Sequence, residues 1–314
     1  MNDFLLSVIV PVYNEENNIK PLLERLLPVI AKYQYELLFV DDGSRDKTFT
    51  IIKEMSKGKA NVKAARFVRN FGHQMALTYG YEHVHGDCVV SLDADLQDPP
   101  EVIPEMVAEW QKGVEIVYAK RKVRHSESFF KQVTAAFFYR FINFLSDTYI
   151  PLDVGDFRLL DKKVVSYINA LPEQSRFLRG LVSWGGFSST YVSFEREKRY
   201  AGTTHYTLSK MLNFATEGIT SFSLKPLRLS IYFGFLASAF SIFVIVFKSI
   251  EHFVLHQGDW LPGWASLFFS TVFLGGVQLI TIGIIGEYVG KIYQQVQKRP
   301  RYIIGETVHI DEKT

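Results

Sequence analysis

In the first half of the chain, hydrophobic residues form short runs that alternate with amphipathic stretches. The runs LLSVIVPVY, ELLFVDDGS, DCVVSLDADL and EIVYAKR are rich in β-branched residues, which predicts four strands. Between these runs, residues 19–32 and 47–57 have helical patterns. Runs without polar alternation are typical of strands buried on both faces. We therefore expect an α/β domain with a parallel sheet covered by helices.

The C-terminal part is uniformly apolar in two places. Residues 229–247 and 260–286 contain no charged side chain. A hydrocarbon core about 30 Å thick needs roughly 20 apolar helical residues, so both segments predict membrane spans. The connector, residues 251–263, has no lysine or arginine, whereas the outer flanks carry Lys225, Arg228, Lys291, Lys298, Arg299 and Arg301. The positive-inside rule therefore predicts that both termini lie in the cytoplasm.

Two further stretches are amphipathic. Residues 129–147 combine six phenylalanines with Lys131 and Arg140, and they predict either a helix at the membrane surface or a core helix packed on the sheet. Residues 207–224 gather their apolar side chains on one helical face just before the first span. This position favours a helix at the membrane interface.

Composition excludes several classes of protein. Of 314 residues, 47% are hydrophobic and 22% are charged, which excludes a disordered or fibrous chain. The net charge of +2 gives no indication of nucleic-acid binding. The single cysteine, Cys88, rules out a disulfide within the chain and favours a reducing compartment. The N-terminal apolar run lacks a basic region before it, so a strand is expected there rather than a signal peptide.

Acidic residues stand where the predicted strands end. Asp41 and Asp42 close the second run, and Asp93 and Asp95 close the third. In doubly wound sheets, ligands bind beyond the carboxyl ends of the strands. Two converging carboxylates suit Mg²⁺ or Mn²⁺ and leave coordination positions open for substrate phosphates. An exposed acidic loop is the alternative for an isolated Asp-x-Asp pattern.

Three motifs in this order, VPVYNEENNI, VDDGSRDKT and DADLQDPP, resemble the family 2 glycosyltransferases, which have the Rossmann-like glycosyltransferase A fold and bind nucleotide sugars. Three later segments, DVGDFRLLDKKV, SRFLRGLVSWGGF and RYAGTTHYTLSKM, are similar to the polyprenyl-phosphate glycosyltransferase branch. That branch includes dolichol-phosphate mannose synthases and undecaprenyl-phosphate glucosyltransferases of the GtrB type, and the two spans favour the latter. The processive-synthase signature Gln-x-x-Arg-Trp is absent, which argues against polymerisation.

The resemblance implies roles for individual residues. The nucleotide and donor contacts are Pro11, Tyr13, Glu15, Val40, Asp42, Asp93, Ala94, Asp95 and Arg121. The metal ligands, for Mg²⁺ or Mn²⁺, are Asp95 and Gln97 with Asp93. The catalytic candidates are Asp156, Asp93 and Arg199, and the candidates for the acceptor phosphate are Arg121, Arg199, His205 and Lys210. His205 stands where the family commonly has lysine, so a permanent cation there is in doubt.

The role of Asp156 has three interpretations. It acts as a catalytic base, it orients the donor sugar or nearby arginines, or it forms a structural ion pair with Arg158 or Arg199. A lipid phosphate is already largely ionised at neutral pH, because its second pKa is about 6. A strong base is therefore less necessary than for a sugar hydroxyl.

The implied function is transfer of a hexose, glucose from UDP-glucose, with inversion onto polyprenyl (undecaprenyl) phosphate at the cytoplasmic membrane face. The alternatives are GDP-mannose or another UDP-sugar as donor, and a non-enzymatic membrane scaffold with a relict nucleotide fold. The expected organisation is a catalytic domain (1–165), a juxtamembrane acceptor region with interfacial helices (166–226), two transmembrane helices (227–290) and a cytoplasmic tail (291–314) with a strand-like pattern. A glycine stripe at Gly276, Gly283, Gly286 and Gly290 leaves a homo-oligomer open.

Overall fold

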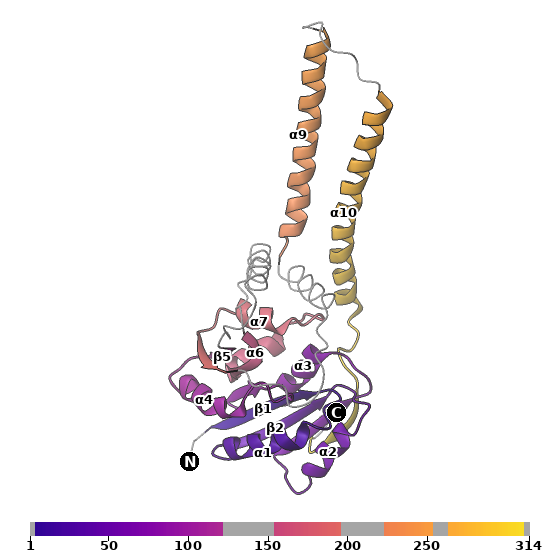
Figure 1. Ribbon diagram of the computed structural model, residues 1–314. Coiled ribbons are helices and arrows are strands. Elements are labelled where there is room, and N and C mark those ends of the chain that lie inside the picture. Colours follow the sequence, from indigo (N-terminus) through magenta and orange to yellow (C-terminus); the bar gives the residue numbers. More distant parts are fainter. Residues whose placement is uncertain (1–3, 122–153, 196–222, 254–262, 311–314) are drawn as a thin grey trace.

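The computed structural model describes residues 4–121, 154–195, 223–253 and 263–310, which form a sheet domain and two long helices that project from it (Figure 1). The strands are β1 (Leu5–Val12), β2 (Gln34–Asp41), β3 (Val62–Phe67), β4 (Cys88–Ser91), β5 (Ile116–Arg121), β6 (Val154–Asp161), β7 (Ser189–Phe194) and β8 (Ile304–Val308). The helices are α1 (Ile19–Ile30), α2 (Thr48–Met55), α3 (His73–His83), the 3-10 turn η1 (Pro100–Val102), α4 (Ile103–Gln111), α6 (Lys162–Ala170), α7 (Leu178–Trp184), α9 (Lys225–Phe253) and α10 (Gly263–Gln297).

The sheet is mixed, with strand order β7-β5-β6-β4-β1-β2-β3-β8. Its centre is parallel, because β1 lies between β2 and β4, and β3 continues beyond β2 in the same direction. However, β6 runs antiparallel to β4 and β5, and β8 runs antiparallel to β3. The four strands expected from the sequence are confirmed as β1, β2, β4 and β5. Because β6 is antiparallel to both β4 and β5, β5 runs in the same direction as β4, and β7 pairs with β5 in parallel. The expectation of a parallel sheet is therefore correct for every described strand except β6 and β8.

Alternating side chains on the strands build one hydrophobic core on each face of the sheet. Val8 and Val10 of β1 pack with α1, α2 and α4 on one face. Ile9 of the same strand packs with α3, α6 and α7 on the other. This two-sided burial explains the uninterrupted apolar runs of the central strands. It also fixes the carboxyl ends of β1, β2 and β4 at a single edge of the sheet.

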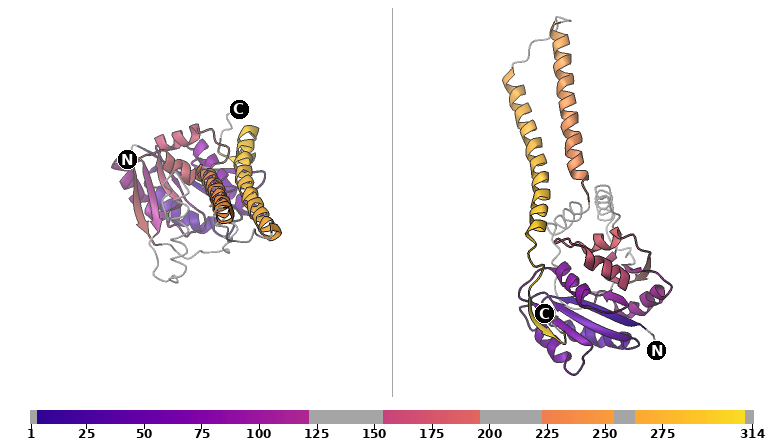
Figure 2. Two further views of the ribbon diagram at one scale, coloured as in Figure 1. Left: turned by 90° about the horizontal axis from the view of Figure 1, so that it is seen from above. Right: turned by 180° about the vertical axis from the view of Figure 1, so that it is seen from behind.

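Helices α9 and α10 leave the domain side by side and run in opposite directions (Figures 1 and 2). Within them, Lys225–Val244 and Ser270–Gln297 are long and apolar enough to cross a membrane, with a mean hydropathy of 1.7 each. Large apolar side chains on both helices are exposed; Phe235, for example, is 74% exposed. Exposed apolar surface of this extent is typical of a helix that contacts lipid. Helix α10 extends to Gln297, beyond the boundary expected at residue 290.

After α10 the chain returns to the sheet. The strand-like pattern of the tail forms β8, which adds to the free edge of β3 (Figure 2). Tyr302 stacks on Phe67 with ring centroids 5.1 Å apart, and Arg301 Nη1 donates to Glu82 Oε1 of α3 at 3.0 Å. Tyr302 also donates a hydrogen bond to Glu82. The C-terminal segment is thus part of the packing of the sheet domain.

Several expectations lie outside the described residues. These are the amphipathic stretch 129–147, nearly all of the stretch 207–224, and the candidates Arg199, His205 and Lys210. In the described part of α10, the glycines of the stripe meet no other segment, since a Cβ placed on each would have nothing within 4 Å. Self-association through this stripe therefore stays a prediction.

Candidate active site

A cavity of about 300 Å³ opens where β1, β2 and β4 end. Its lining residues are Pro11, Val12, Tyr13, Glu15, Asp42, Asn70, Gly72, His73, Ala76, Asp93, Ala94 and Asp95. The lining contains seven of the nine residues expected to contact the nucleotide and donor sugar. The other two, Val40 and Arg121, lie elsewhere. Seven of the twelve lining residues are therefore ones that the family resemblance implies, and their roles in donor binding stay predictions.

Asp42 organises the loop that forms one wall of the cavity. Its carboxylate accepts hydrogen bonds from the backbone N–H groups of Phe71, at 2.6 Å, and Gly72, at 2.9 Å. Burial raises the pKa of Asp42, although these two N–H groups act to lower it. Asp42 thus holds the segment between β3 and α3 against the end of β2, and this places Asn70 and His73 at the cavity.

Asp93 and Asp95 line the opposite wall, in the loop after β4. Enclosure raises the pKa of Asp93, and the carboxylates of Asp156 and Asp95 add to this rise. Leu96, which follows Asp95, is buried and has a φ of +58°. This backbone conformation costs a residue with a side chain about 1–3 kcal/mol. Asp95 Oδ1 accepts the backbone N–H of Gln97 at 3.1 Å, which contributes to fixing the strained turn.

The donor chemistry of this wall fits a divalent cation. Mg²⁺ and Mn²⁺ bind through one or two carboxylates together with phosphate oxygens and water. Asp93 and Asp95 supply two carboxylates to one cavity. Among the described residues, no group of three His, Cys, Asp or Glu side chains is placed to hold a metal by itself. Gln97, the third expected ligand, is not among the residues that line the cavity.

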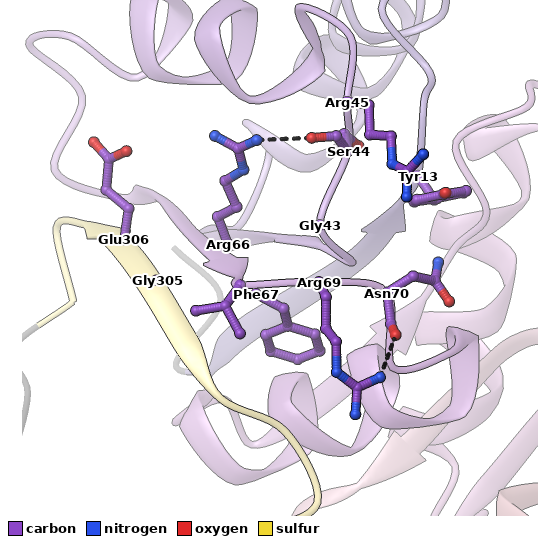
Figure 3. Close-up of a pocket in the computed structure, with 11 residues that line it drawn as sticks. Tyr13, Gly43, Ser44, Arg45, Arg66, Phe67, Arg69, Asn70, Gly305 and Glu306 are labelled. Atoms are coloured by element: carbon purple, nitrogen blue, oxygen red, sulfur yellow. Dashed lines mark hydrogen bonds between the residues drawn. The ribbon is translucent and has the colours of Figure 1, made fainter.

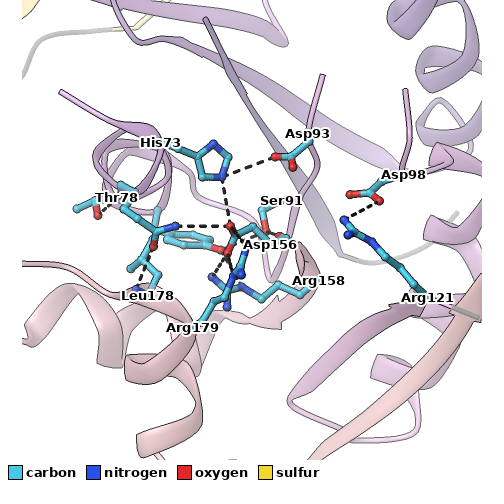
Figure 4. Close-up of polar contacts among 12 residues, drawn as sticks. His73, Thr78, Ser91, Asp93, Asp98, Arg121, Asp156, Arg158, Leu178 and Arg179 are labelled. Atoms are coloured by element: carbon cyan, nitrogen blue, oxygen red, sulfur yellow. Dashed lines mark hydrogen bonds and ion pairs between the residues drawn. The ribbon is translucent and has the colours of Figure 1, made fainter. Parts of the chain in front are cut away.

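His73 connects the cavity to a second polar cluster (Figure 4). Its Nε2 lies 3.6 Å from Asp93 Oδ1 and 3.3 Å from Asp156 Oδ2. Enclosure opposes the charged form of His73, but the carboxylates of Asp93 and Asp156 outweigh it and raise its pKa to about 9. His73 begins α3, so the loop that Asp42 anchors also delivers this imidazole to the aspartates.

Asp156 is surrounded by cations. It is 4% exposed, and Arg179 holds it with two nitrogens, Nε at 3.1 Å from Oδ1 and Nη2 at 2.9 Å from Oδ2. Arg158 Nη2 lies 3.5 Å from Asp156 Oδ1 and is fully buried. Burial opposes the charge of Asp156, but Arg179, His73 and Arg158 hold its pKa well below the usual range. The ion pair with Arg158, one of the alternatives for Asp156, is therefore present, and Arg179 makes a closer contact.

Three expected site residues lie away from the cavity. Val40 is buried in the hydrophobic core, where its side chain packs with Ile9 and Leu38. Arg121 stands at the end of β5 as expected, but its Nη2 lies 3.5 Å from Asp98 Oδ1 (Figure 4). Gln97 lies next to the cavity wall, with its backbone bonded to Asp95. Their expected roles in donor and metal binding stay predictions.

A second, wider cavity of about 630 Å³ adjoins the first, and the two share Tyr13 and Asn70 (Figure 3). Arg45, Arg66 and Arg69 line it, and the tail contributes Gly305 and Glu306. The Arg66 guanidinium is partly engaged, since Nη2 donates to the backbone oxygen of Ser44 at 2.7 Å. The combined surface is acidic on the β4 side and basic on the β3 side.

Two residues of the polar cluster were not among the candidate site residues. His73 follows Gly72 in the loop between β3 and α3, outside the three motifs that carry the family resemblance. Arg179 is one arginine on a seven-residue helix and carries no spacing signal. Asp156, Arg179 and His73 come from β6, α7 and α3, so only the folded chain brings them together.

Both the sequence and the fold are similar to those of known proteins. Residues 7–168 match the family described as Glycosyl transferase family 2. The chain is 46% identical over 98% of its length to the Bacillus subtilis protein "Uncharacterized glycosyltransferase YkcC", of which it covers 95%. It is 42% identical over 95% of its length to "Bactoprenol glucosyl transferase" of Shigella phage SfII, of which it covers 97%. Among solved structures, glucosyl-3-phosphoglycerate synthase from Mycobacterium tuberculosis has a TM-score of 0.50 at 18% identity, with 69% of this chain and 78% of that chain covered.

Proposed function

The chain belongs to glycosyltransferase family 2 and has its glycosyltransferase A fold, and from this premise we propose that it transfers glucose from UDP-glucose onto polyprenyl (undecaprenyl) phosphate. The proposal rests on the presence of two features in the same chain. An acidic cavity lies at the ends of β1, β2 and β4, and the same domain continues into two apolar helices. The Shigella phage relative, named a bactoprenol glucosyl transferase, aligns over almost its entire length and supports this acceptor.

Donor binding is assigned to the cavity wall. Tyr13, Glu15 and Asp42 contact the nucleoside, and Asp93 and Asp95 face the diphosphate. Two carboxylates beside a diphosphate repel it unless a cation is held between them. Asp93 and Asp95 would hold Mg²⁺ or Mn²⁺, and the bound ion would supply positive charge against the leaving nucleoside diphosphate. His73, which contacts Asp93, adds positive charge at the same wall.

Asp156 is assigned a positioning role in the reaction. A general base works best when its pKa lies near the working pH, whereas Arg179, His73 and Arg158 stabilise Asp156 as a carboxylate. The acceptor phosphate has a second pKa of about 6, so its oxygen is already negative at neutral pH and attacks the sugar carbon without a strong base. Asp156 then serves to orient Arg179 and His73, and the cations balance charge as the oxygen of the diphosphate leaves.

The membrane supplies the acceptor. Burying a polyprenyl chain is worth about 0.8 kcal/mol per methylene, so the lipid stays in the bilayer and the enzyme works at its surface. We assign the catalytic domain and both termini to the cytoplasmic side. The cations Lys225, Arg228, Lys291 and Lys298 on the domain side of α9 and α10 support this orientation.

A panel of radiolabelled donors tests the proposal. Full-length protein in detergent is incubated with undecaprenyl phosphate, Mg²⁺ or Mn²⁺, and UDP-glucose, GDP-mannose or UDP-N-acetylglucosamine. We expect label in the lipid fraction with UDP-glucose. Label from another donor instead would correct the sugar but keep the enzyme class. No transfer from any donor would overturn the proposal and favour a membrane scaffold with a relict nucleotide fold.

A further inference from the structure

The C-terminal end of α10 forms hydrogen bonds with the loop that leads into α7. Gln295, near the end of α10, accepts the backbone N–H of Gln174 on its Oε1 at 2.8 Å. Its Nε2 donates to the backbone oxygen of Pro172 at 3.1 Å. One side chain therefore satisfies two main-chain groups of the α6–α7 loop. Because the contact is to the backbone on both sides, it fixes the path of the loop rather than one side chain.

The loop carries this restraint into α7. Arg176 lies inside it, is 1% exposed, and donates to the backbone oxygens of Ile168, at 2.6 Å, and Leu171, at 2.8 Å. These bonds tie the loop to the end of α6 and leave it little freedom to flex. Helix α7 begins at Leu178, whose N–H donates to Gln74 Oε1 of α3 at 3.1 Å.

The next residue of α7 is Arg179, which holds Asp156 with two nitrogens. Helix α7 is thus fixed from two sides: α10 grips the loop before it, and Asp156 and Gln74 hold its first turn. A seven-residue helix contributes little stability of its own, so its position depends on these contacts. Loss of the α10 contact would loosen the end of α7 that carries Arg179.

We infer that Gln295 is a positioning residue for the proposed transfer: by holding the backbone at Pro172 and Gln174, it keeps Arg179 on Asp156. The inference rests on the proposed function and adds to it a link between the bilayer and the reaction centre. The same helix that lies in the membrane with the acceptor lipid sets the geometry at Asp156. The position of α10 and the contact between Arg179 and Asp156 are therefore coupled.

Neighbouring glutamines provide the test. Gln295→Ala removes both bonds, Gln295→Glu keeps an acceptor for the Gln174 N–H, and Gln294→Ala changes an exposed residue of the same type one position away. In full-length protein with UDP-glucose and undecaprenyl phosphate, we expect Gln295→Ala to lower kcat about five- to tenfold, with the KM for the donor unchanged. Gln295→Glu should recover part of the rate, and Gln294→Ala should match wild type.

Hydrogen–deuterium exchange gives a readout that does not depend on turnover. The Gln174 amide, which Gln295 protects, should exchange faster in Gln295→Ala and not in Gln294→Ala. Active wild-type protein with equal kcat in both alanine variants would overturn the inference alone. A rise in donor KM that accounts for the loss would also overturn it, because this would indicate general loosening of the domain. Wild-type protein that transfers no sugar would instead overturn the proposed function.

Discussion

Arg179 binds Asp156 through both ends of its guanidinium fork, with contacts of 3.1 and 2.9 Å, and this pair joins α7 to β6 next to the acidic cavity. A two-nitrogen contact with a buried carboxylate is more restrictive than a single charge contact, because it fixes direction as well as distance.

Replacing Arg179 by lysine should keep a positive charge but lose the two-nitrogen geometry. We expect kcat to fall about 100-fold, equivalent to roughly 2.7 kcal/mol, with UDP binding retained. The measurement is steady-state transfer together with calorimetric titration of UDP. Arg25→Lys, at an exposed ion pair with Glu101, is the matched control and should leave kcat unchanged. A normal kcat in Arg179→Lys would show that the fork geometry has no role in turnover.

Chelation of divalent cations should stop transfer, and added Mg²⁺ or Mn²⁺ should restore it. In Asp95→Asn, one of the two carboxylates at the cavity is neutral, so we expect a higher metal concentration for half-maximal activity and a kcat reduced about 100- to 1,000-fold. Glu54→Gln, on the exposed face of α2, controls for the loss of one negative charge. Full activity in the presence of excess chelator would contradict the assignment of a metal to this wall.

His73→Gln should separate the imidazole's charge from its hydrogen bonding. Glutamine still donates a hydrogen bond but carries no charge toward Asp93 and Asp156, which lie 3.6 and 3.3 Å from Nε2. We expect kcat to fall about 10- to 100-fold, because a charge near the leaving group is lost. His85→Gln, at an exposed histidine away from the cavity, provides the control. Equal kcat in the two variants would contradict a role for the His73 charge in the reaction.

Gly43 and Gly58 offer a paired test of the loop after β2. Both have a positive φ, +72° and +73°, but a Cβ on Gly43 would lie 2.4 Å from the carbonyl carbon of Arg69, whereas a Cβ on Gly58 meets nothing within 4 Å. We expect both alanine variants to lose about 1 kcal/mol from the backbone conformation. Only Gly43→Ala should also weaken UDP binding, since Gly43 must approach the β3–α3 loop that lines the cavities. Equal UDP affinity in both variants would exclude this close approach as a requirement.

The free energy of unfolding should fall in acid because of Glu36. This residue lies near the start of β2, at the end of the sheet away from the cavity. Burial opposes its charge, but the N–H of His85, Lys63 and Ser7 hold the pKa of Glu36 below its usual value. A carboxyl with a lowered pKa in the folded state stabilises the protein above its unfolded pKa of about 4.3. That contribution is lost as the pH falls through the lower folded value.

The measurement is thermal unfolding in detergent at pH 7 and at pH 3 to 4. Glu36→Gln should lower the stability by about 1–3 kcal/mol at pH 7, because a buried charged partner of Lys63 is lost. The difference from wild type should shrink toward pH 3. Glu24→Gln on the exposed side of α1 should show neither effect. A difference that stays constant with pH would contradict this origin.

Hydrophobic pattern predicted the strands that are buried on both faces, and failed where charge lies inside a strand. In β6, Asp156 and Arg158 alternate with Phe157 and Leu159, and all four are nearly inaccessible to water. A charged residue in a strand ordinarily indicates a solvent face, so the pattern concealed a strand at the centre of the sheet. In β3, Lys63 and Arg66 had the same effect. Because the pattern did not indicate β6, the sequence contained no sign of a strand that runs antiparallel to its neighbours β4 and β5.

The candidate site was predictable where motifs stand at strand ends, as for Asp42, Asp93 and Asp95. It was not predictable where a role depends on tertiary contacts between single residues. Arg179 meets Asp156 only because α7 packs across β6, and His73 reaches the aspartates only because Asp42 fixes its loop. Neither relationship has a fixed spacing along the chain.

The short segment between α10 and β8 limits how far the sheet domain can lie from the end of α10. Residues 298–303 alone separate the end of α10 from the strand that completes the sheet. Six extended residues reach at most about 20 Å, and the contacts of Arg301 and Tyr302 with α3 shorten that reach. If α10 spans a membrane as proposed, this short connection keeps the sheet domain at a nearly constant distance from the bilayer that would hold the lipid substrate.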